Sequence, residues 1–251
     1  MACRNNGNSL TLLDRLRLCL PGSCLLCGSQ VRRVISLCQD CESRMPRMRL
    51  CCGVCGVAVS TTSWTGSCGR CLLKPPPFTL CRGVFHYQSP VSKLLTDFKY
   101  HARFACGRAL AWQLAGAFLE YYDAARSVFG TDQLPQLLIP IPLHSRRLRQ
   151  RGFNQAQLLS EVIAARTAVP MTNQLLTRTR YTEAQSQLHA SKRAVNLSNA
   201  FSVTGQLPDP GLRHIAVIDD VITTTATARA ATRALLSAGA ERVDVWAAAR
   251  A

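Results

Sequence analysis

Blocks of hydrophobic and polar positions follow one another along the chain, and the clearest block lies near its C-terminal end. The stretch 214–218 contains an unbroken apolar run, which predicts a strand buried on both faces of a parallel sheet. Apolar residues recur at helical spacing over 226–238, and Gly239 follows as a natural C-terminal cap. Asp219, Asp220 and several threonines lie between the two, so we expect them in a strand-to-helix turn. In open α/β sheets, ligands bind at such turns.

Other parts of the chain repeat this alternation. Short apolar runs predict strands, and apolar positions three and four residues apart predict helices. The expected strands lie at 85–87, 136–139 and 242–248, and the expected helices at 89–98, at 105–125 and after Asn154. Asn154 is a good N-cap for the last of these helices. The alternation predicts an α/β fold with a doubly wound, mostly parallel sheet.

Positive charge dominates the sequence. The chain has 30 Lys and Arg against 14 Asp and Glu, for a formal net charge of +16. The expected loop between the strand at 136–139 and Asn154 is especially basic, since LHSRRLRQRGFNQ contains four arginines. Arginine suits bidentate phosphate contacts, so the balance favours a polyanionic partner, either nucleic acid or a small phosphorylated ligand. An ordinary basic surface is the alternative.

Cysteines are the second compositional signal. Eight of the 13 form four CxxC pairs, which are Cys24 and Cys27, Cys38 and Cys41, Cys52 and Cys55, and Cys68 and Cys71. Two thiolates in one tight turn can hold a tetrahedral zinc ion, and this spacing predicts two structural zinc sites. Disulfides and a redox site are the alternatives, but the first needs an oxidising compartment and the second needs only one CxxC. Spacing leaves sequential and crossed pairing open, and it leaves Cys51 open as a substitute for Cys52.

The sequence suggests three parts. The segment Lys74-Pro75-Pro76-Pro77 predicts a stiff exit from the cysteine-rich region. We therefore expect an N-terminal helix or tail at 1–23, zinc ribbons at 24–77 and the sheet domain at 78–251. No apolar run approaches the ~20 residues that a membrane span needs, and the N-terminal region is unlike a signal peptide. These features predict a cytoplasmic protein without membrane insertion.

The chemistry of the acidic turn points to a sugar phosphate. A helix N-terminus attracts phosphate, and threonine hydroxyls add hydrogen-bond donors without adding charge. The two carboxylates would instead meet sugar hydroxyls or a divalent cation such as magnesium, which commonly bridges phosphate oxygens. The alternative is a solvated strand end whose aspartate caps the helix.

The sequence VIDDVITTTAT resembles the phosphoribosyl pyrophosphate (PRPP) signature of type I phosphoribosyltransferases. The whole chain after residue 20 resembles the ComF/GntX family, through its double zinc ribbon, KPPP, IPIPLHSRRLRQRGFNQAQLL and TRTRYTEAQSQLHASKRAVNLSNAF. This resemblance implies a phosphoribosyltransferase-type fold and a role in DNA uptake during natural transformation, or in the use of DNA as a nutrient.

The resemblance also implies roles for individual residues. Asp219 and Asp220 would meet the ribose hydroxyls of magnesium-bound PRPP. The remaining implied contacts are the 5-phosphate loop of Thr223, Thr224, Thr225, Ala226 and Thr227, diphosphate or DNA contacts by Arg146, Arg147 and Arg151, and a mobile loop with Gln185, Arg193 and Asn196. Solvated or ordinary loop residues are the alternatives for the last two groups. Lys99 is a weaker candidate for a phosphate or DNA contact, and we expect it to be a surface residue instead. The sequence indicates no catalytic base.

Thr225 departs from the superfamily pattern, which usually has glycine there. Glycine adopts positive φ freely, whereas a β-branched residue pays about 1–2 kcal/mol. Either this loop avoids positive φ or it binds phosphate more weakly. Three functions follow: a phosphoribosyltransferase, a protein that binds single-stranded DNA with PRPP as a regulator, or an assembly module that docks a helicase or DNA-import partner.

Overall fold

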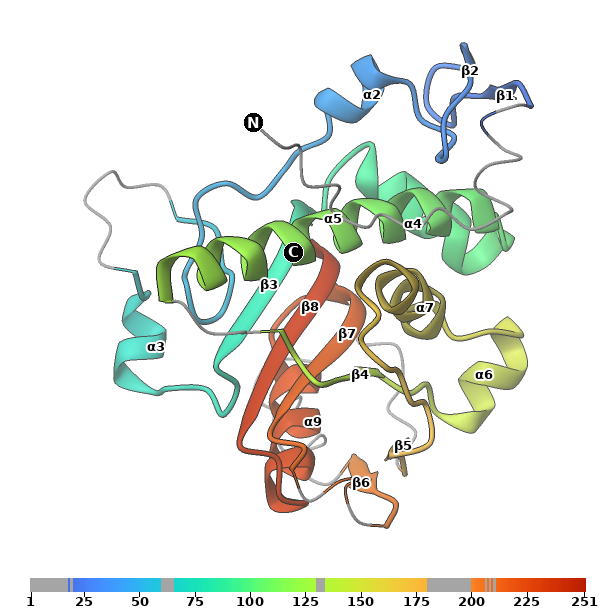
Figure 1. Ribbon diagram of the computed structural model, residues 1–251. Coiled ribbons are helices and arrows are strands. Elements are labelled where there is room, and N and C mark those ends of the chain that lie inside the picture. Colours follow the sequence, from blue (N-terminus) through green and yellow to red (C-terminus); the bar gives the residue numbers. More distant parts are fainter. Residues whose placement is uncertain are drawn as a thin grey trace.

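A parallel sheet of four strands crosses the centre of the protein (Figure 1). The computed structural model describes residues 18, 20–59, 66–129, 134–179, 200–205, 207, 209 and 211–251. The strand order is β3-β8-β7-β4, and each neighbouring pair is parallel. The strands are β3 (Leu80–His86), β4 (Leu137–Pro140), β7 (His214–Ile222) and β8 (Arg242–Arg250). The predicted α/β fold with a parallel sheet is confirmed.

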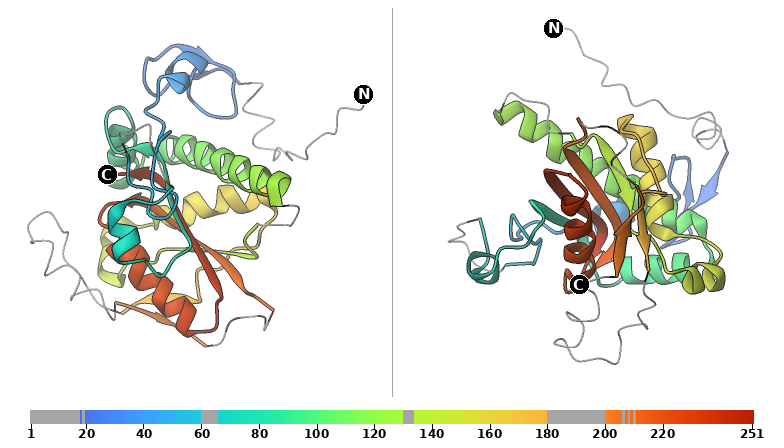
Figure 2. Two further views of the ribbon diagram at one scale, coloured as in Figure 1. Left: turned by 90° about the vertical axis from the view of Figure 1, so that its left-hand side faces the viewer. Right: turned by 90° about the horizontal axis from the view of Figure 1, so that it is seen from below.

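Helices cover both faces of this sheet, so it is doubly wound. Helices α5 (Phe104–Phe129) and α7 (Gln155–Thr167) pack on one face, and α9 (Ala226–Ser237) packs on the other (Figure 2). Strand β7 explains why its sequence is apolar without a break. Its residues Ala216 and Ile218 belong to the core on the α5 side, while Ile215 and Val217 belong to the core on the α9 side.

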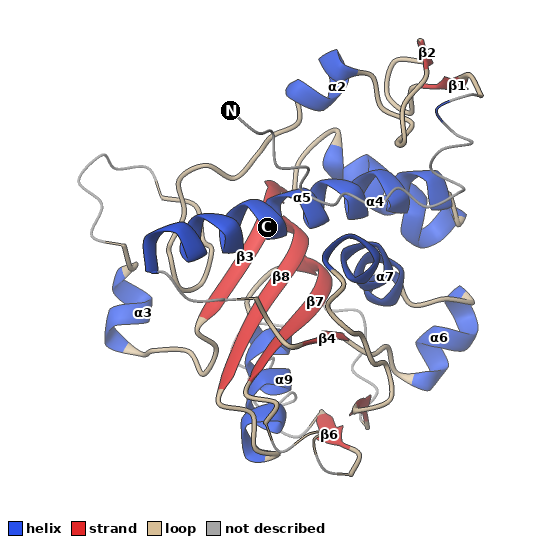
Figure 3. Cartoon of the chain, viewed as in Figure 1, coloured by secondary structure: helices blue, strands red, loops and turns tan. Residues whose placement is uncertain are grey.

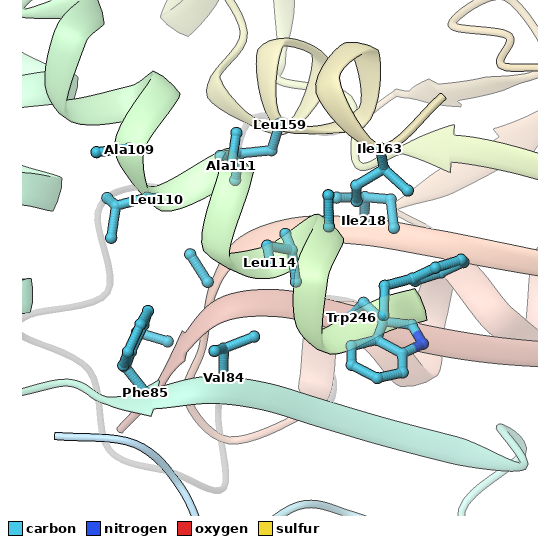
Figure 4. Packing of buried hydrophobic residues seen from close by; sticks show 14 of the residues in the cluster. Val84, Phe85, Ala109, Leu110, Ala111, Leu114, Leu159, Ile163, Ile218 and Trp246 are labelled. Carbon is cyan, nitrogen blue, oxygen red and sulfur yellow. The ribbon is translucent and has the colours of Figure 1, made fainter. Parts of the chain in front are cut away.

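The core on the α5 side fixes the helices that carry the site. Leu110 and Leu114 of α5 belong to one core with Trp246 of β8 and with Leu159 and Ile163 of α7 (Figure 4). Helix α4 (Val91–His101) lies against α5 through Phe98, and a Cβ atom at Gly107 would collide with the Phe98 ring. This close approach requires glycine, and it holds the end of α4 in place.

The cysteine-rich region is built mostly of loops (Figure 3). Its regular elements are β1 (Gly22–Ser23), β2 (Gln30–Val31), α2 (Gln39–Ser43) and α3 (Gly69–Leu73). Its first half contacts α5, because Gln113 donates to Glu42 and accepts from Arg47. Its second half shares a core with Phe78 and with Cys81 of β3. The division of the chain at residue 77 stays a prediction.

Two local predictions were wrong, for different physical reasons. Strand β7 does not end at Ile218 but continues through Asp219 and Asp220, since its parallel pairing with β8 extends to Ile222. The basic segment is not a loop but contains the helix α6 (Ser145–Arg151), which His144 caps at its start. Serine, arginine, leucine and glutamine make up α6, and the absence of Gly, Pro and β-branched residues favours helix.

Several element boundaries also differ from the prediction. The strand expected at 85–87 begins at Leu80, and the two helices that follow it extend to His101 and Phe129. A small antiparallel pair of β5 (Leu176–Arg178) and β6 (Phe201–Val203) was not predicted. Gln185, Arg193 and Asn196 lie outside the described residues. No helix within the described ranges combines the length and the apolar character that a bilayer crossing requires.

Candidate functional sites: two cysteine clusters and a charged pocket

The eight CxxC cysteines form two separate clusters of four. Cys24, Cys27, Cys38 and Cys41 make the first, and Cys52, Cys55, Cys68 and Cys71 make the second, with all sulfurs of a cluster within 4.8 Å of one another. The sulfurs of Cys27 and Cys38 are 3.7 Å apart, and those of Cys55 and Cys68 are 3.6 Å apart. Four sulfurs about 2.3 Å from one zinc ion are spaced about 3.8 Å apart, whereas a disulfide would need about 2.05 Å. The donor set therefore fits zinc.

Both clusters are built in the same way. The first knuckle turns back through a glycine with positive φ, which is Gly28 in one cluster and Gly56 in the other. The second knuckle begins a short helix, because Cys38 is the N-cap of α2 and Cys68 is the N-cap of α3. The chain thus carries two copies of one zinc-ribbon design.

Backbone amides prepare the first cysteine of each cluster as a thiolate. Burial opposes the ionisation of Cys24, but amides that donate to its sulfur outweigh burial and lower the pKa of the thiol to about 6. The same balance lowers the pKa of Cys52 to about 7. Zinc binds thiolates, so this arrangement favours the metal-bound form near neutral pH.

A cavity of about 810 Å³ lies where the end of β7 meets α4, α6 and the start of α9. Asp219, Asp220, Thr223 and Thr227 line it on one side. Its basic lining residues are Lys99, Arg147, Arg151 and Arg178. The pocket therefore combines two carboxylates with four cationic side chains, as a ligand with both hydroxyl and phosphate groups would require.

The two aspartates differ in their partners. Asp220 forms a 2.7 Å ion pair with Nζ of Lys99. Asp219 accepts a 2.8 Å hydrogen bond from the backbone amide of Asp220. Burial, together with the negative charge of Asp220, raises the pKa of Asp219 to about 8, although the amide and Lys99 oppose this shift. A carboxyl group whose pKa is raised by burial and by a like charge is characteristic of functional sites.

The turn after β7 is fixed at its start by hydrogen bonds from Arg250 and at its end by the first turn of α9. Thr225 has φ of 62° and is the N-cap residue of α9, and its side chain is buried. Nη1 of Arg250 donates to the backbone oxygen of Ile222 at 3.2 Å and also to that of Thr223. The turn is therefore a fixed structure at the N-terminus of a helix, where backbone amides attract anions.

The three arginines of the pocket lie on two elements. Arg147 and Arg151 belong to α6, and Arg151 donates to Gln155 while its guanidinium lies over the Tyr100 ring at 5.3 Å. Arg178 belongs to β5, and burial and the positive charge of Arg147 lower its pKa. Like-charge crowding of this kind is relieved when an anion binds.

Comparison with known proteins places the chain in a family. The double zinc ribbon domain family matches residues 15–72. The chain is 37% identical to the DNA utilization protein YhgH of Salmonella typhimurium over 239 residues, covering 94% of this chain and 95% of that protein. It is 35% identical to competence protein F of Haemophilus influenzae, covering 86% and 90%, and 27% identical to competence protein ComFC of Bacillus subtilis, covering 86% and 89%. The chain belongs to the ComF family.

ComF membership and the cluster geometry agree on the metal. The predicted structural zinc is confirmed, and the cysteines group sequentially rather than in the crossed scheme. Cys52 belongs to the second cluster, and Cys51 lies outside both clusters. The double zinc ribbon and the parallel sheet with helices on both faces are also consistent with the fold that the family resemblance implied.

The pocket brings together part of the predicted site of this ComF protein. Asp219, Asp220, Thr223, Thr227, Arg147 and Arg151 all line the cavity. Within the described part of the chain, Thr224, Thr225 and Ala226 share the turn without lining the cavity, and Arg146 points outward as an exposed residue of α6.

Sequence reasoning misplaced one basic residue of the pocket, Lys99, and did not single out another, Arg178. Lys99 was expected at the surface, yet its side chain is only 18% exposed and pairs with Asp220. Its position depends on how α4 packs against α5, which no local pattern encodes. Arg178 was not singled out, although it stands in TRTRYTEAQSQL, one of the segments that carried the family resemblance.

Proposed function

We propose that this ComF-family protein binds PRPP together with magnesium in the charged pocket, and that it acts in the uptake or use of DNA. The observation that carries the proposal is the pairing of Asp219 and Asp220 with a threonine turn at the start of α9, inside one cavity that also holds four cationic side chains. Carboxylates accept hydrogen bonds from ribose hydroxyls, and helix amides and arginines bind phosphates.

Magnesium would enter with the ligand. Asp219 and Asp220 supply the oxygen donors that magnesium prefers, and magnesium usually combines one or two carboxylates with substrate phosphates and water. Its contribution would be to neutralise the diphosphate as the ligand settles. The residues of the chain itself would then orient the ribose and hold the phosphates.

The role in DNA metabolism is supported by the names of the relatives. YhgH is described as a DNA utilization protein, and the Haemophilus influenzae and Bacillus subtilis relatives are described as competence proteins. The match to YhgH spans 94% of this chain and 95% of that protein, so it covers both the cysteine-rich region and the sheet region of this chain.

A second candidate is binding without transfer. Thr225 occupies the left-handed region at φ of 62°, where the superfamily pattern has glycine, and its Cβ stands beside the backbone that would cradle a phosphate. This feature favours a pocket that senses PRPP while the rest of the protein binds single-stranded DNA or docks a helicase or DNA-import partner. Exposed arginines in the cysteine-rich region, such as Arg32 and Arg49, suit a nucleic-acid backbone.

Calorimetric titration of the zinc-loaded protein with PRPP and magnesium tests the proposal. We expect one site per chain and at least a tenfold loss of affinity in Asp219→Asn/Asp220→Asn, because the amides cannot replace two charged acceptors. Asp123→Asn on the exposed surface of α5 is the matched control. Absence of binding in the unmodified protein with two zinc ions bound would reject the proposal. Incubation of the PRPP complex with candidate acceptors, followed by pyrophosphate detection, separates transfer from binding alone.

A further inference from the structure

Lys99 and Asp220 form an ion pair on the wall of the pocket. Their charged atoms are 2.7 Å apart, and their side chains are 18% and 14% exposed. Oδ1 of Asp220 accepts a 2.7 Å hydrogen bond from the amide of Val221, so Lys99 takes the other carboxylate oxygen. Lys99 therefore neutralises Oδ2 of Asp220, the carboxylate oxygen to which the amide of Val221 does not donate.

We propose that Lys99 is a specificity-determining residue: it occupies the place that a divalent cation would otherwise take at Asp220, so that the free pocket excludes bare cations and admits a sugar phosphate. The first half of this inference concerns the protein without ligand. The second half rests on the proposed function, in which PRPP is the ligand.

The fold holds Lys99 in this position. The adjacent Phe98 is buried against Gly107 and lies 5.3 Å from the ring of Phe153, which precedes α7. Beyond Lys99 the helix α4 ends at Ala102 in the left-handed conformation. A side chain at the end of a helix fixed on two sides is a preorganised cation, and it loses less entropy in pairing than a lysine on a free surface.

An ammonium group and a divalent cation compete for the same carboxylate oxygens, but they differ in how they affect the binding of a sugar phosphate. Magnesium would bring a shell of water, whereas the ammonium group of Lys99 brings three hydrogen-bond donors. When ribose hydroxyls donate to Asp220, the lysine keeps its charge in the pocket and can turn a donor toward a phosphate oxygen. The four cations then outnumber the two carboxylates, which favours an anionic ligand.

The experiment compares Lys99→Met with Lys93→Met, a charge deletion on the exposed side of the same helix. Mn²⁺ serves as the probe because it prefers oxygen ligands and leaves thiolate zinc sites alone. Bound Mn²⁺ is measured by electron paramagnetic resonance on the full-length, zinc-loaded protein in the absence of PRPP. We expect Lys99→Met to bind one Mn²⁺ at least tenfold more tightly than the unmodified protein, and we expect Lys93→Met and Lys99→Arg to match the unmodified protein.

Two further arms make the result specific. Lys99→Met/Asp220→Asn should lose the new Mn²⁺ site, which a general loosening of the fold would not do. PRPP affinity should fall about tenfold in Lys99→Met and stay unchanged in Lys93→Met. Equal Mn²⁺ binding by Lys99→Met and the unmodified protein overturns the inference. If the unmodified protein binds no PRPP while Lys99→Met gains the Mn²⁺ site, the proposed function fails and the role of Lys99 at Asp220 stands.

Discussion

Nε of Arg229 donates a 3.3 Å hydrogen bond to Oγ1 of Thr225, across the first turn of α9. The backbone amide of Arg229 donates to the carbonyl oxygen of the same threonine at 2.8 Å. Thr225 is thereby held in the left-handed region although its branched Cβ disfavours that region. Thr225 therefore carries the backbone strain of the turn between β7 and α9. The hydrogen bonds from Arg229 hold Thr225 in this strained conformation.

Replacing Thr225 measures this strain. Thr225→Ala and Thr225→Gly both remove the hydroxyl and its bond to Arg229, but only glycine removes the Cβ that opposes positive φ. We expect Thr225→Gly to be more stable than Thr225→Ala by about 1 kcal/mol. Urea unfolding followed by circular dichroism gives both values. Equal stability of the two variants would mean that the turn relaxes away from positive φ in solution.

A second prediction concerns pH. Asp219 has its pKa raised to about 8 by burial and by Asp220, whereas in the unfolded chain it titrates near its ordinary value. Between these two pH values the folded state keeps a proton that the unfolded state has released. The free energy of unfolding contributed by this group is therefore fully present in acid and falls as pH rises from about 4 to about 8.

Asp219→Asn removes that dependence. We expect the variant to be more stable than the unmodified protein at pH 8, by on the order of 5 kcal/mol, and to lose the advantage toward pH 4. Thermal unfolding at half-unit pH steps provides the comparison. Asp123→Asn, an exposed aspartate on α5, should run parallel to the unmodified protein across the range. A constant difference between Asp219→Asn and the unmodified protein at every pH would contradict the prediction.

The sequence predicted the parts of the fold that depend on neighbours along the chain. The apolar run before Asp219 and the helical spacing after Ala226 are local patterns, and the strand and the helix both begin where they were expected. Asn154 caps α7 through a 3.1 Å bond from the amide of Ala156, as its side chain predicts. CxxC spacing is local as well, so the cysteines of each knuckle were identified together.

What escaped prediction depends on residues far apart in sequence. The extension of β7 to Ile222 follows from its pairing with β8, more than twenty residues later. Lys99 faces the pocket because α4 packs against α5 and Phe153, and Arg178 faces it because β5 pairs with β6. Hydrophobic periodicity assigns each residue to a face of its own element, but it does not say which cavity that face borders.

A third prediction concerns the buried carboxylate of Asp244 on β8. Its Oδ2 accepts a 2.6 Å hydrogen bond from the hydroxyl of Tyr122, lies 2.8 Å from Nε2 of His214 and also faces Arg242 at 3.1 Å. Burial alone would raise the pKa of Asp244, but His214 and these other partners lower it. The tyrosine hydroxyl in turn accepts from Nε1 of Trp246 at 3.2 Å.

Removing one hydroxyl tests the strength of this network. Tyr122→Phe leaves Trp246 Nε1 without its acceptor and Asp244 with one donor fewer, so we expect a loss of about 2–3 kcal/mol of unfolding free energy. Tyr121→Phe, on the neighbouring position of the same helix, is the matched control because Tyr121 is only partly buried. Urea unfolding gives the free energy of unfolding of both variants, and we expect only Tyr122→Phe to show this loss. The network contributes nothing to stability if both variants unfold at the same midpoint.

The last prediction concerns the unequal burial of the two zinc clusters. Cys52 is completely buried, and Cys55 and Cys71 are nearly so, whereas Cys27 of the first cluster is exposed. The second cluster shares its core with Phe78, whose ring faces the guanidinium of Arg229 at 5.8 Å. Loss of zinc from the second cluster should therefore loosen the contact between Phe78 and Arg229. Because Arg229 holds Thr225, the turn beside the pocket should then become more mobile.

Cys71→Ser and Cys41→Ser, at equivalent positions of the two clusters, test this difference. Each variant should bind one zinc ion per chain instead of two, measured by elemental analysis. We expect Cys71→Ser to lower the melting temperature by several degrees more than Cys41→Ser, because Cys71 is buried whereas Cys41 is only partly buried. Amide hydrogen exchange should rise at the start of α9 in Cys71→Ser alone. Equal hydrogen exchange at the start of α9 in both variants would show that the second zinc cluster does not stabilise the turn between β7 and α9.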